Sequence, residues 1–324
     1  MTAPITEFRL AQPSTVKEAV AARLRQPDSR YIAGGTDLLV NMRRGISRPE
    51  LLVDLSGIEV LSETRSDNGG VTIGAGVTLA ALARNTEIVD RYCALAQAAA
   101  AIAGPGHRVI ATVGGNLCLD TRCIYYNQSE WWRHANAYCL KNRGDTCHVA
   151  PQGRRCHAAF SGDLAPALLV YGAEIDIAGA QGERRIPLSD LYVEDGKAHL
   201  ALAPGELVVA VHLPAAPPPS AYEKLRQRGA IDFPLAGVAV ALAASKGKID
   251  SLRVALTGTN SRPFLLAGTD AFTGRTVDDR LLQEIDRLVQ KQVQPMRTTL
   301  ASANYRRVAA AALARRLIAK LFAA

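Results

Sequence analysis

Four cysteines in one short segment constrain this chain more than any other feature. Cys123, Cys139, Cys147 and Cys156 lie between two glycine-bearing segments, Ala-Thr-Val-Gly-Gly-Asn (111–116) and Ser-Gly-Asp-Leu-Ala-Pro-Ala-Leu (161–168). Thiolates grouped in fours bind soft metal ions or iron–sulfur clusters, and the glycine segments are typical of cofactor-binding loops. The pattern therefore predicts two redox centres close enough to exchange electrons.

The spacing of the cysteines does not select the metal. The gaps of 15, 7 and 8 residues between them match no short Cys-x2-Cys template, so a zinc ion, an iron–sulfur cluster and free thiols all remain open. Cys118 directly follows a glycine segment and Cys93 lies in an alanine-rich helical pattern, so both are interpreted as packed thiols. Three histidines flank the four cysteines and are alternative ligands: His134, His148 and His157.

Composition limits the class of protein. The 324 residues are 48% hydrophobic, enough for two or three domains of roughly 100–200 residues each. No signal peptide and no apolar run of about 18 residues is evident, which predicts a cytoplasmic protein without a membrane span and with reduced cysteines. The net charge of +8 is spread along the chain without a nucleic-acid-binding motif, so an acidic protein or an anionic substrate is the better partner.

Periodicity divides the chain into three parts. Residues 1–60 are typical of a βαβ unit, with Ser14 before the first helix and a strand at Tyr31 to Ala33. Residues 61–212 alternate strands and helices around an insertion at about 120–160. The proline-rich stretch 213–224 predicts a linker to a third part, 213–324. There, 233–245 and 249–259 are expected to pair antiparallel around a Lys-Gly turn, followed by three helical segments.

Two glycine segments are suited to binding a long dinucleotide. Ala33, Gly34, Gly35, Thr36 and Asp37 form the first, and Thr112, Gly114, Gly115 and Asn116 belong to the second. Glycines allow the backbone to approach an anion, and amides at a turn or helix start point towards it. Neither segment has the Gly-x-Gly-x-x-Gly of nicotinamide-binding proteins, and no Walker A lysine is present.

At the level of motifs, the chain resembles the FAD-binding medium subunit of the xanthine oxidase or molybdenum hydroxylase family. The motifs that carry the resemblance occur in order along nearly the whole chain: AGGTDLLV, TIGAGVTL, ATVGGNLC, SGDLAPALLVYGA, GELVVAVHLP and EKLRQRGAIDFPLAGVAVAL. The resemblance implies an α+β fold: a two-subdomain FAD-binding domain of the vanillyl-alcohol-oxidase-like (PCMH) type, then an α+β domain of CO-dehydrogenase-flavoprotein type with a small antiparallel sheet.

The same resemblance assigns roles to individual residues. It implies that Ala33 to Asp37 line the FAD pyrophosphate and that the segment from Thr112 to Asn116 forms the opposite wall. Asp163 would hold sugar hydroxyls and Lys224 would lie near the flavin ring. A helix N-cap at Asp163 and a solvated Lys224 are the alternatives.

The cysteine segment departs from the usual family pattern. It resembles the insertion of the β subunit of 4-hydroxybenzoyl-CoA reductase, which implies a [4Fe–4S] cluster on Cys123, Cys139, Cys147 and Cys156. The implied enzyme dehydroxylates 4-hydroxybenzoyl-CoA, takes electrons from reduced ferredoxin, and contains a molybdopterin-carrying large subunit and a [2Fe–2S] small subunit. Some bacterial aldehyde oxidoreductases of the family have a similar insertion. The alternatives are therefore an aldehyde or xanthine-type flavoprotein subunit and a zinc-stabilised nucleotide-binding module.

Basic residues surround the insertion, with only Glu130 and Asp145 as expected carboxylate partners. This excess of positive charge predicts either a docking surface for an acidic ferredoxin or compensation for the charge of a cluster. The cations are Arg122, Arg133, Lys141, Arg143, Arg154 and Arg155.

Overall fold

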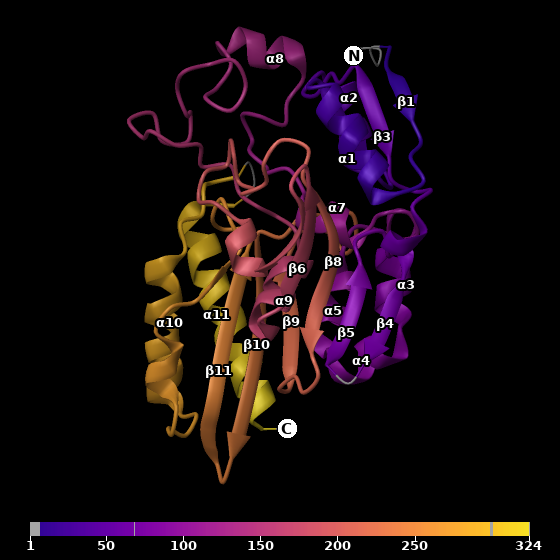
Figure 1. Ribbon diagram of the computed structural model, residues 1–324. Helices are drawn as coiled ribbons and strands as arrows, with labels where there is room; N and C mark the ends of the chain where they lie inside the picture. The colour runs from indigo at the N-terminus through magenta and orange to yellow at the C-terminus, as the bar shows by residue number, and fades with distance from the viewer. Residues whose placement is uncertain (1–6, 68, 299–300, 324) are drawn as a thin grey trace.

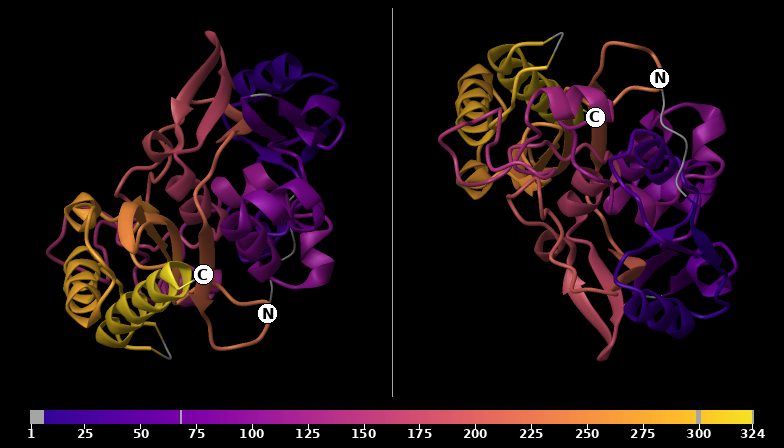
Figure 2. Two further views of the ribbon diagram at one scale, coloured as in Figure 1. Left: turned by 90° about the horizontal axis from the view of Figure 1, so that it is seen from below. Right: turned by 90° about the horizontal axis from the view of Figure 1, so that it is seen from above.

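The computed structural model describes residues 7–67, 69–298 and 301–323, which form three sheets, their covering helices and a lobe of irregular chain (Figure 1). The lobe is the cysteine-bearing insertion and contains one helix, α8 (Glu130–Ala135). The first sheet and the last two helices lie at opposite ends of the molecule (Figure 2). No helix among the described residues combines the length and the apolar content that crossing a membrane requires.

The first sheet is a parallel βαβ unit, as the sequence predicts. Its strands are β1 (Arg9–Ala11), β2 (Ser29–Ile32) and β3 (Leu51–Asp54), in the order β1-β3-β2. Parallel strands need a crossover connection, and helices α1 (Val16–Arg25) and α2 (Leu38–Arg43) supply it.

The start of α1 differs from the expectation by one residue. Thr15, not Ser14, is the N-cap: its hydroxyl accepts from the Glu18 amide at 3.1 Å. The Glu18 carboxylate reaches back to the amide and hydroxyl of Ser14. A Thr-x-x-Glu pair thus satisfies donors that the helix itself leaves open.

A five-stranded antiparallel sheet forms the middle of the molecule, in the order β4-β5-β8-β6-β7. Its strands are β4 (Thr64–Asp67), β5 (Gly70–Gly74), β6 (Glu174–Gly179), β7 (Gly182–Pro187) and β8 (Leu207–Pro214). Helical segments pack against its strands or connect them: η1 (Glu59–Ser62), α3 (Leu79–Arg84), α4 (Thr86–Arg91), α5 (Cys93–Ala101), α6 (Pro105–Arg108), α7 (Val113–Leu117), α9 (Leu164–Tyr171) and η2 (Leu188–Leu191).

The helical pattern around Cys93 does not form one continuous helix. α4 and α5 meet at Tyr92, whose φ of −122° and ψ of 54° leave the helical region. Tyr92 is fully buried and its hydroxyl donates to the Pro214 carbonyl. A single long-range contact therefore overrides the local helical pattern.

The third sheet is antiparallel, in the order β12-β11-β10-β9. Its strands are β9 (Ser220–Leu225), β10 (Ala236–Ser245), β11 (Lys248–Thr257) and β12 (Phe264–Leu265). The expected hairpin is confirmed, with both turn residues, Lys246 and Gly247, at positive φ. Of the three expected helical segments, α10 (Asp279–Gln292) and α11 (Ala303–Phe322) are α-helices and η3 (Thr269–Phe272) is a 3-10 turn.

Both faces of this third sheet are buried. One face packs with α10 and α11, while Ala239, Ala241 and Ala255 on the other face join the core of the middle sheet. The strands also extend into the proline-rich stretch, so that only residues 215–219 lie outside strands there. The linker expected over 213–224 is therefore much shorter, because its ends pair in two sheets.

A buried arginine joins the loops at one end of the third sheet. The Arg306 guanidinium, 2% exposed, donates to the carbonyls of Leu235, Gly258 and Met296. Burial lowers its pKa to about 10. One side chain thus satisfies three carbonyls from three separate segments.

We expect Arg306→Gln to lower the melting temperature by about 5 °C or more, because buried carbonyls lose their donors at roughly 1–3 kcal/mol each. Differential scanning calorimetry measures this change. The neighbouring, half-exposed Arg307 provides the control, and Arg307→Gln should shift the melting temperature little. Equal shifts in the two variants would contradict the structural role of Arg306.

Candidate functional site

The first glycine segment is a half-buried loop between β2 and α2. The amides of Gly34, Gly35 and Thr36 have no acceptor within the described residues, and Gly35 adopts a positive φ of 66°. A Cβ atom on Gly34 would lie 2.0 Å from the carbonyl oxygen of Ile110. The loop thus lies directly against the second glycine segment and presents free amide donors, which is what a phosphate oxygen requires.

The second glycine segment forms the short helix α7, and most of its amides bind the protein itself. Val113 donates to Val77 at 2.9 Å, Gly114 donates to Ala75 at 2.7 Å, and Gly115 donates to the Thr112 hydroxyl at 3.1 Å. The expectation that these amides point at an anion is therefore wrong. The segment remains a predicted wall of the cofactor site, through its side chains and its close packing.

Asn116, and not Asp163, caps the helix α9. The Asn116 side-chain oxygen accepts from the Leu164 amide at 3.0 Å and so caps α9. Asp163 precedes α9 but makes no capping hydrogen bond. Its carboxylate instead accepts from the Tyr222 hydroxyl and from the Lys224 ammonium, which lies 3.1 Å away.

The Asp163–Lys224 pair is almost completely buried, with side chains 4% and 2% exposed. Lys224 also donates to the Asp232 carbonyl at 3.2 Å, so it is not the solvated lysine of the alternative reading. Burial raises the pKa of Asp163, and the Lys224 charge opposes that rise. Tyr222 was missed from the sequence, although alternation along β9 places it on the same face as Lys224.

An ion pair joins the first glycine segment to the insertion. Asp37 pairs with Arg122, whose guanidinium also lies 4.6 Å from the centre of the Phe233 ring. The Asn41 amide donates to the same carboxylate at 3.0 Å. Because Arg122 precedes Cys123 directly, the predicted nucleotide loop and the four-cysteine segment are linked by one side-chain contact.

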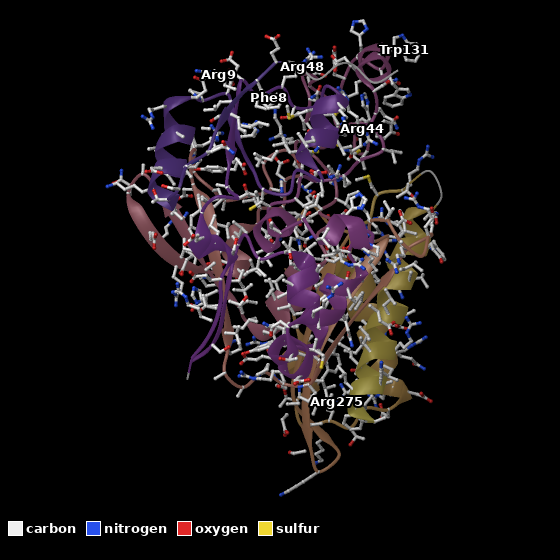
Figure 3. The ribbon with its side chains drawn as sticks, turned by 90° about the vertical axis from the view of Figure 1, so that its right-hand side faces the viewer. Phe8, Arg9, Arg44, Arg48, Trp131 and Arg275 are labelled. Atoms are coloured by element: carbon white, nitrogen blue, oxygen red, sulfur yellow. The ribbon has the colours of Figure 1, made fainter. Side chains whose placement is uncertain are left out.

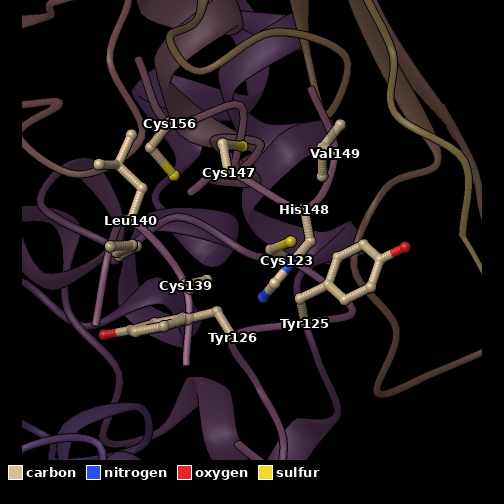
Figure 4. A pocket seen from close by; sticks show the side chains of 10 residues that line it. Cys123, Tyr125, Tyr126, Cys139, Leu140, Cys147, His148, Val149 and Cys156 are labelled. Carbon is tan, nitrogen blue, oxygen red and sulfur yellow. The ribbon is translucent and has the colours of Figure 1, made fainter. Parts of the chain in front are cut away.

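The four cysteines come together, although 7 to 15 residues separate each from the next. Cys123, Cys139, Cys147 and Cys156 line one small cavity, together with Tyr125, Tyr126, Leu140, Lys141, His148 and Val149. Figure 4 shows the sulfur atoms of Cys123, Cys147 and Cys156 around a common space. Cys93 and Cys118 are not part of this lining.

The spacing of the four thiols differs from that of a preformed zinc site. Zinc bonds sulfur at about 2.3 Å, which requires four sulfurs in close mutual contact. In the described part of the chain, no three His, Cys, Asp or Glu side chains are grouped tightly enough to hold a single ion. Burial raises the pKa of the Cys123 thiol to about 11 and that of Cys156 to about 12.

Most cations around the insertion already have carboxylate partners, which corrects the expected excess of free charge. Partners outside the insertion proper are Asp37, Asp120 and Glu194, and Glu130 is shared by two arginines. The pairs are Arg122–Asp37, Lys141–Asp120, Arg155–Glu194, Arg133–Glu130 and Arg143–Glu130.

The outer surface of the lobe is mixed in character. Trp131 on α8 is 77% exposed, and Figure 3 places it at the same end of the molecule as Arg44 and Arg48. Arg154 is exposed as well, whereas Arg133 is 1% exposed and packs inside the lobe. A docking surface would therefore consist of Trp131 and a few exposed arginines, not of all six cations.

We expect Lys224→Met to destabilise the chain by roughly 3–5 kcal/mol, because the Asp163 carboxylate would stay buried without its counterion. The double variant Asp163→Asn/Lys224→Met should lose less than Lys224→Met alone. Thermal unfolding measures both, with the exposed Lys291→Met as control. Simple addition of two independent losses would contradict the coupling.

Two family models together cover nearly the whole chain. Residues 6–216 match the FAD binding domain in molybdopterin dehydrogenase, and residues 220–321 match the CO dehydrogenase flavoprotein C-terminal domain. Among solved structures, Cu,Mo-CO dehydrogenase in its cyanide-inactivated form superposes with a TM-score of 0.81 at 25% identity, over 99% of both chains. The α+β fold expected from the resemblance is thereby confirmed.

Curated relatives agree with the family models. The chain is 34% identical over 276 residues to the aldehyde oxidoreductase FAD-binding subunit PaoB of Escherichia coli (strain K12), covering 82% of this chain and 85% of that protein. It is 27% identical over 316 residues to the carbon monoxide dehydrogenase medium chain of Afipia carboxidovorans, covering 96% and 95%. The chain belongs to the family of FAD-binding subunits of molybdopterin dehydrogenases.

Proposed function

We propose that this chain is the electron-transfer subunit of an aldehyde-oxidising molybdenum enzyme, with FAD in the glycine-lined site and a [4Fe–4S] cluster in the four-cysteine cavity. Its partners are a molybdopterin-carrying large subunit and a [2Fe–2S] small subunit. The observation that carries the proposal is the convergence of Cys123, Cys139, Cys147 and Cys156 on one cavity beside the glycine segments. Substrate oxidation itself takes place on a partner subunit.

The relatives favour oxidation of an aldehyde over reduction of a CoA thioester. The relative with 34% identity is named as an aldehyde oxidoreductase subunit, and xanthine and carbon monoxide dehydrogenase subunits match at 25–27%. The expectation of 4-hydroxybenzoyl-CoA as substrate rested on the insertion, and it has no support among these names. With an oxidised substrate, electrons leave through this chain, so an external acceptor replaces reduced ferredoxin as the partner.

The residues present fit FAD. Gly34, Gly35 and Thr36 offer amides without protein acceptors, and the close contact of Gly34 with Ile110 leaves no room for a side chain. Ala33 and Asp37 complete the loop, and Thr112, Gly114, Gly115 and Asn116 form the facing wall. Bound flavin supplies the conversion between two-electron and one-electron chemistry. The flavin binds between the units 1–60 and 61–212. Residues 213–324 pack against the core of the second of these units.

Asp163 and Lys224 support the flavin site indirectly, by joining two elements of the fold. Because both are buried and paired with each other, their role is to fix α9 against β9 and not to carry net charge to the cofactor. That Lys224 lies near the flavin ring stays a prediction.

The donor set of four thiols is the one that an iron–sulfur cluster requires, since thiolates are the usual ligands of [4Fe–4S] clusters. A cluster supplies one-electron storage next to the flavin. Cys139, Cys147 and Cys156 are buried and Cys123 is half-buried, so the chain shields the site from water.

Gly34→Ala should abolish or strongly weaken flavin binding, because the added methyl group would overlap the Ile110 carbonyl and force the two glycine segments apart. Flavin absorbance per purified chain measures the effect. Gly106→Ala is the matched control, since a Cβ at Gly106 meets no atom within 4 Å. Full flavin content in Gly34→Ala would contradict the proposed position of the cofactor.

The cluster is tested by measuring iron, acid-labile sulfide, zinc and flavin in the anaerobically purified complex. The variant with serine at Cys123, Cys139, Cys147 and Cys156 should lose iron and sulfide and keep its FAD. Cys93→Ser, which changes a thiol outside the cavity, should keep all three. One zinc and no iron in the wild type would instead support the zinc-stabilised alternative.

The substrate class is tested with the whole complex. Oxidation of aromatic and aliphatic aldehydes is assayed beside xanthine oxidation and dehydroxylation of 4-hydroxybenzoyl-CoA. Turnover of aldehydes alone supports the proposal, whereas turnover of the CoA thioester would support a role in the reduction of 4-hydroxybenzoyl-CoA instead.

A further inference from the structure

A buried lysine lies in the wall of the four-thiol cavity. Lys141, two residues after Cys139, lines the cavity and its side chain is only 5% exposed. Burial of an ammonium group is unfavourable unless the group is paired. Its presence beside four thiols therefore needs a reason beyond packing.

The three N–H bonds of the Lys141 ammonium are all used outside the cavity. They reach Asp120 Oδ1 at 2.6 Å, the Thr121 carbonyl at 3.1 Å and the Thr121 hydroxyl. The ammonium also lies 4.2 Å from the centre of the Tyr126 ring. Because an ammonium has three donors and no more, Lys141 is held in place and acts on the cavity as a fixed charge, not as a hydrogen-bond donor to sulfur.

The partner carboxylate cancels this charge only in part. Asp120 is 29% exposed, whereas Lys141 is 5% exposed. Water therefore screens the negative charge more than the positive one. The cavity consequently feels a net positive potential from this pair.

We propose that Lys141 is the fixed positive charge that stabilises the reduced, more negative state of a cluster held by the four cysteines, and that Asp120 tunes this effect in the opposite direction. The inference rests on the proposed function, because it concerns the cluster placed in that cavity. Net charge and solvent exposure are among the factors that set the potential of such clusters. A buried unit charge in the cavity wall is a large contribution at the effective dielectric of a protein, and Lys141 acts electrostatically on the Cys156 thiol.

Asp120 and Thr121 also connect the two cofactor sites. They belong to the segment between α7 and Cys123, and Thr121 is fully buried with its hydroxyl donating to the Gly196 carbonyl at 2.6 Å. Lys141 thus fixes the cluster lobe to the end of the flavin wall.

The experiment is a redox titration of the anaerobically purified complex, followed by low-temperature electron paramagnetic resonance. Lys141→Met should lower the reduced-to-oxidised ratio of the cluster at a fixed potential by about tenfold. For one electron this corresponds to a negative shift of the cluster's reduction potential by about 59 mV. Asp120→Asn should shift the potential in the positive direction. Arg154→Met removes an exposed cation two residues before Cys156 and should shift it less than Lys141→Met does.

The outcomes separate the two proposals. Iron-free wild type overturns the proposed function and this inference together. Iron-loaded Lys141→Met with an unchanged potential overturns only the inference. A shift of the same sign in Lys141→Met and Asp120→Asn also overturns it, because a charge effect requires shifts of opposite sign. If Lys141→Met fails to retain iron, the charge-conserving Lys141→Arg must keep the wild-type potential and Asp120→Asn must still shift it upward, or the inference is wrong.

Discussion

Direct contact between backbones at glycines is the constraint on which this structure depends. Three glycines bring distant segments together: a Cβ at Gly34 would lie 2.0 Å from the Ile110 carbonyl oxygen, one at Gly114 would lie 3.1 Å from the Ala75 carbonyl oxygen, and one at Gly162 would lie 2.6 Å from the Asn116 carbonyl oxygen. Any side chain at these points would push the segments apart. The first sheet, the middle sheet and α9 can therefore meet at one place only because glycines allow it.

The insertion fits this arrangement because it is closed at its base. Arg122 and Ala159 exchange two backbone hydrogen bonds, of 2.7 and 2.8 Å. The chain leaves and re-enters the core at neighbouring points, so the cost of the extra loop is mainly entropic and rises slowly with length. The irregular lobe then needs its own fixed points, which the ion pairs Asp37–Arg122 and Asp120–Lys141 provide. The same closure holds Cys123, which directly follows Arg122, at the base of the lobe.

Local features were predictable from the sequence and long-range pairings were not. The βαβ unit and the Lys246-Gly247 hairpin follow from periodicity and turn residues, which act over a few positions. The break at Tyr92 and the pairing of Asp163 with Lys224 depend on residues more than 50 positions away. A charge pattern does not show which distant residues pair, so the sequence indicates only Glu130 and Asp145 as partners for the cations of the insertion. Convergence of the cysteines was predictable only because four thiols in one short segment are typical ligands of a common metal ion or iron–sulfur cluster.

The distribution of charge in the lobe bears on how it exchanges electrons. If the cations formed one open surface, salt would screen them and their effect on a buried centre would be small. Instead Arg133 and Lys141 are 1% and 5% exposed, and each is paired with a carboxylate that is more exposed than itself. For Lys141, which lines the cavity of the cysteines, this asymmetry leaves the positive charge on the buried side. Under the proposed function, the buried positive charge of this lobe would act on the cluster, and an external partner would meet the exposed Trp131.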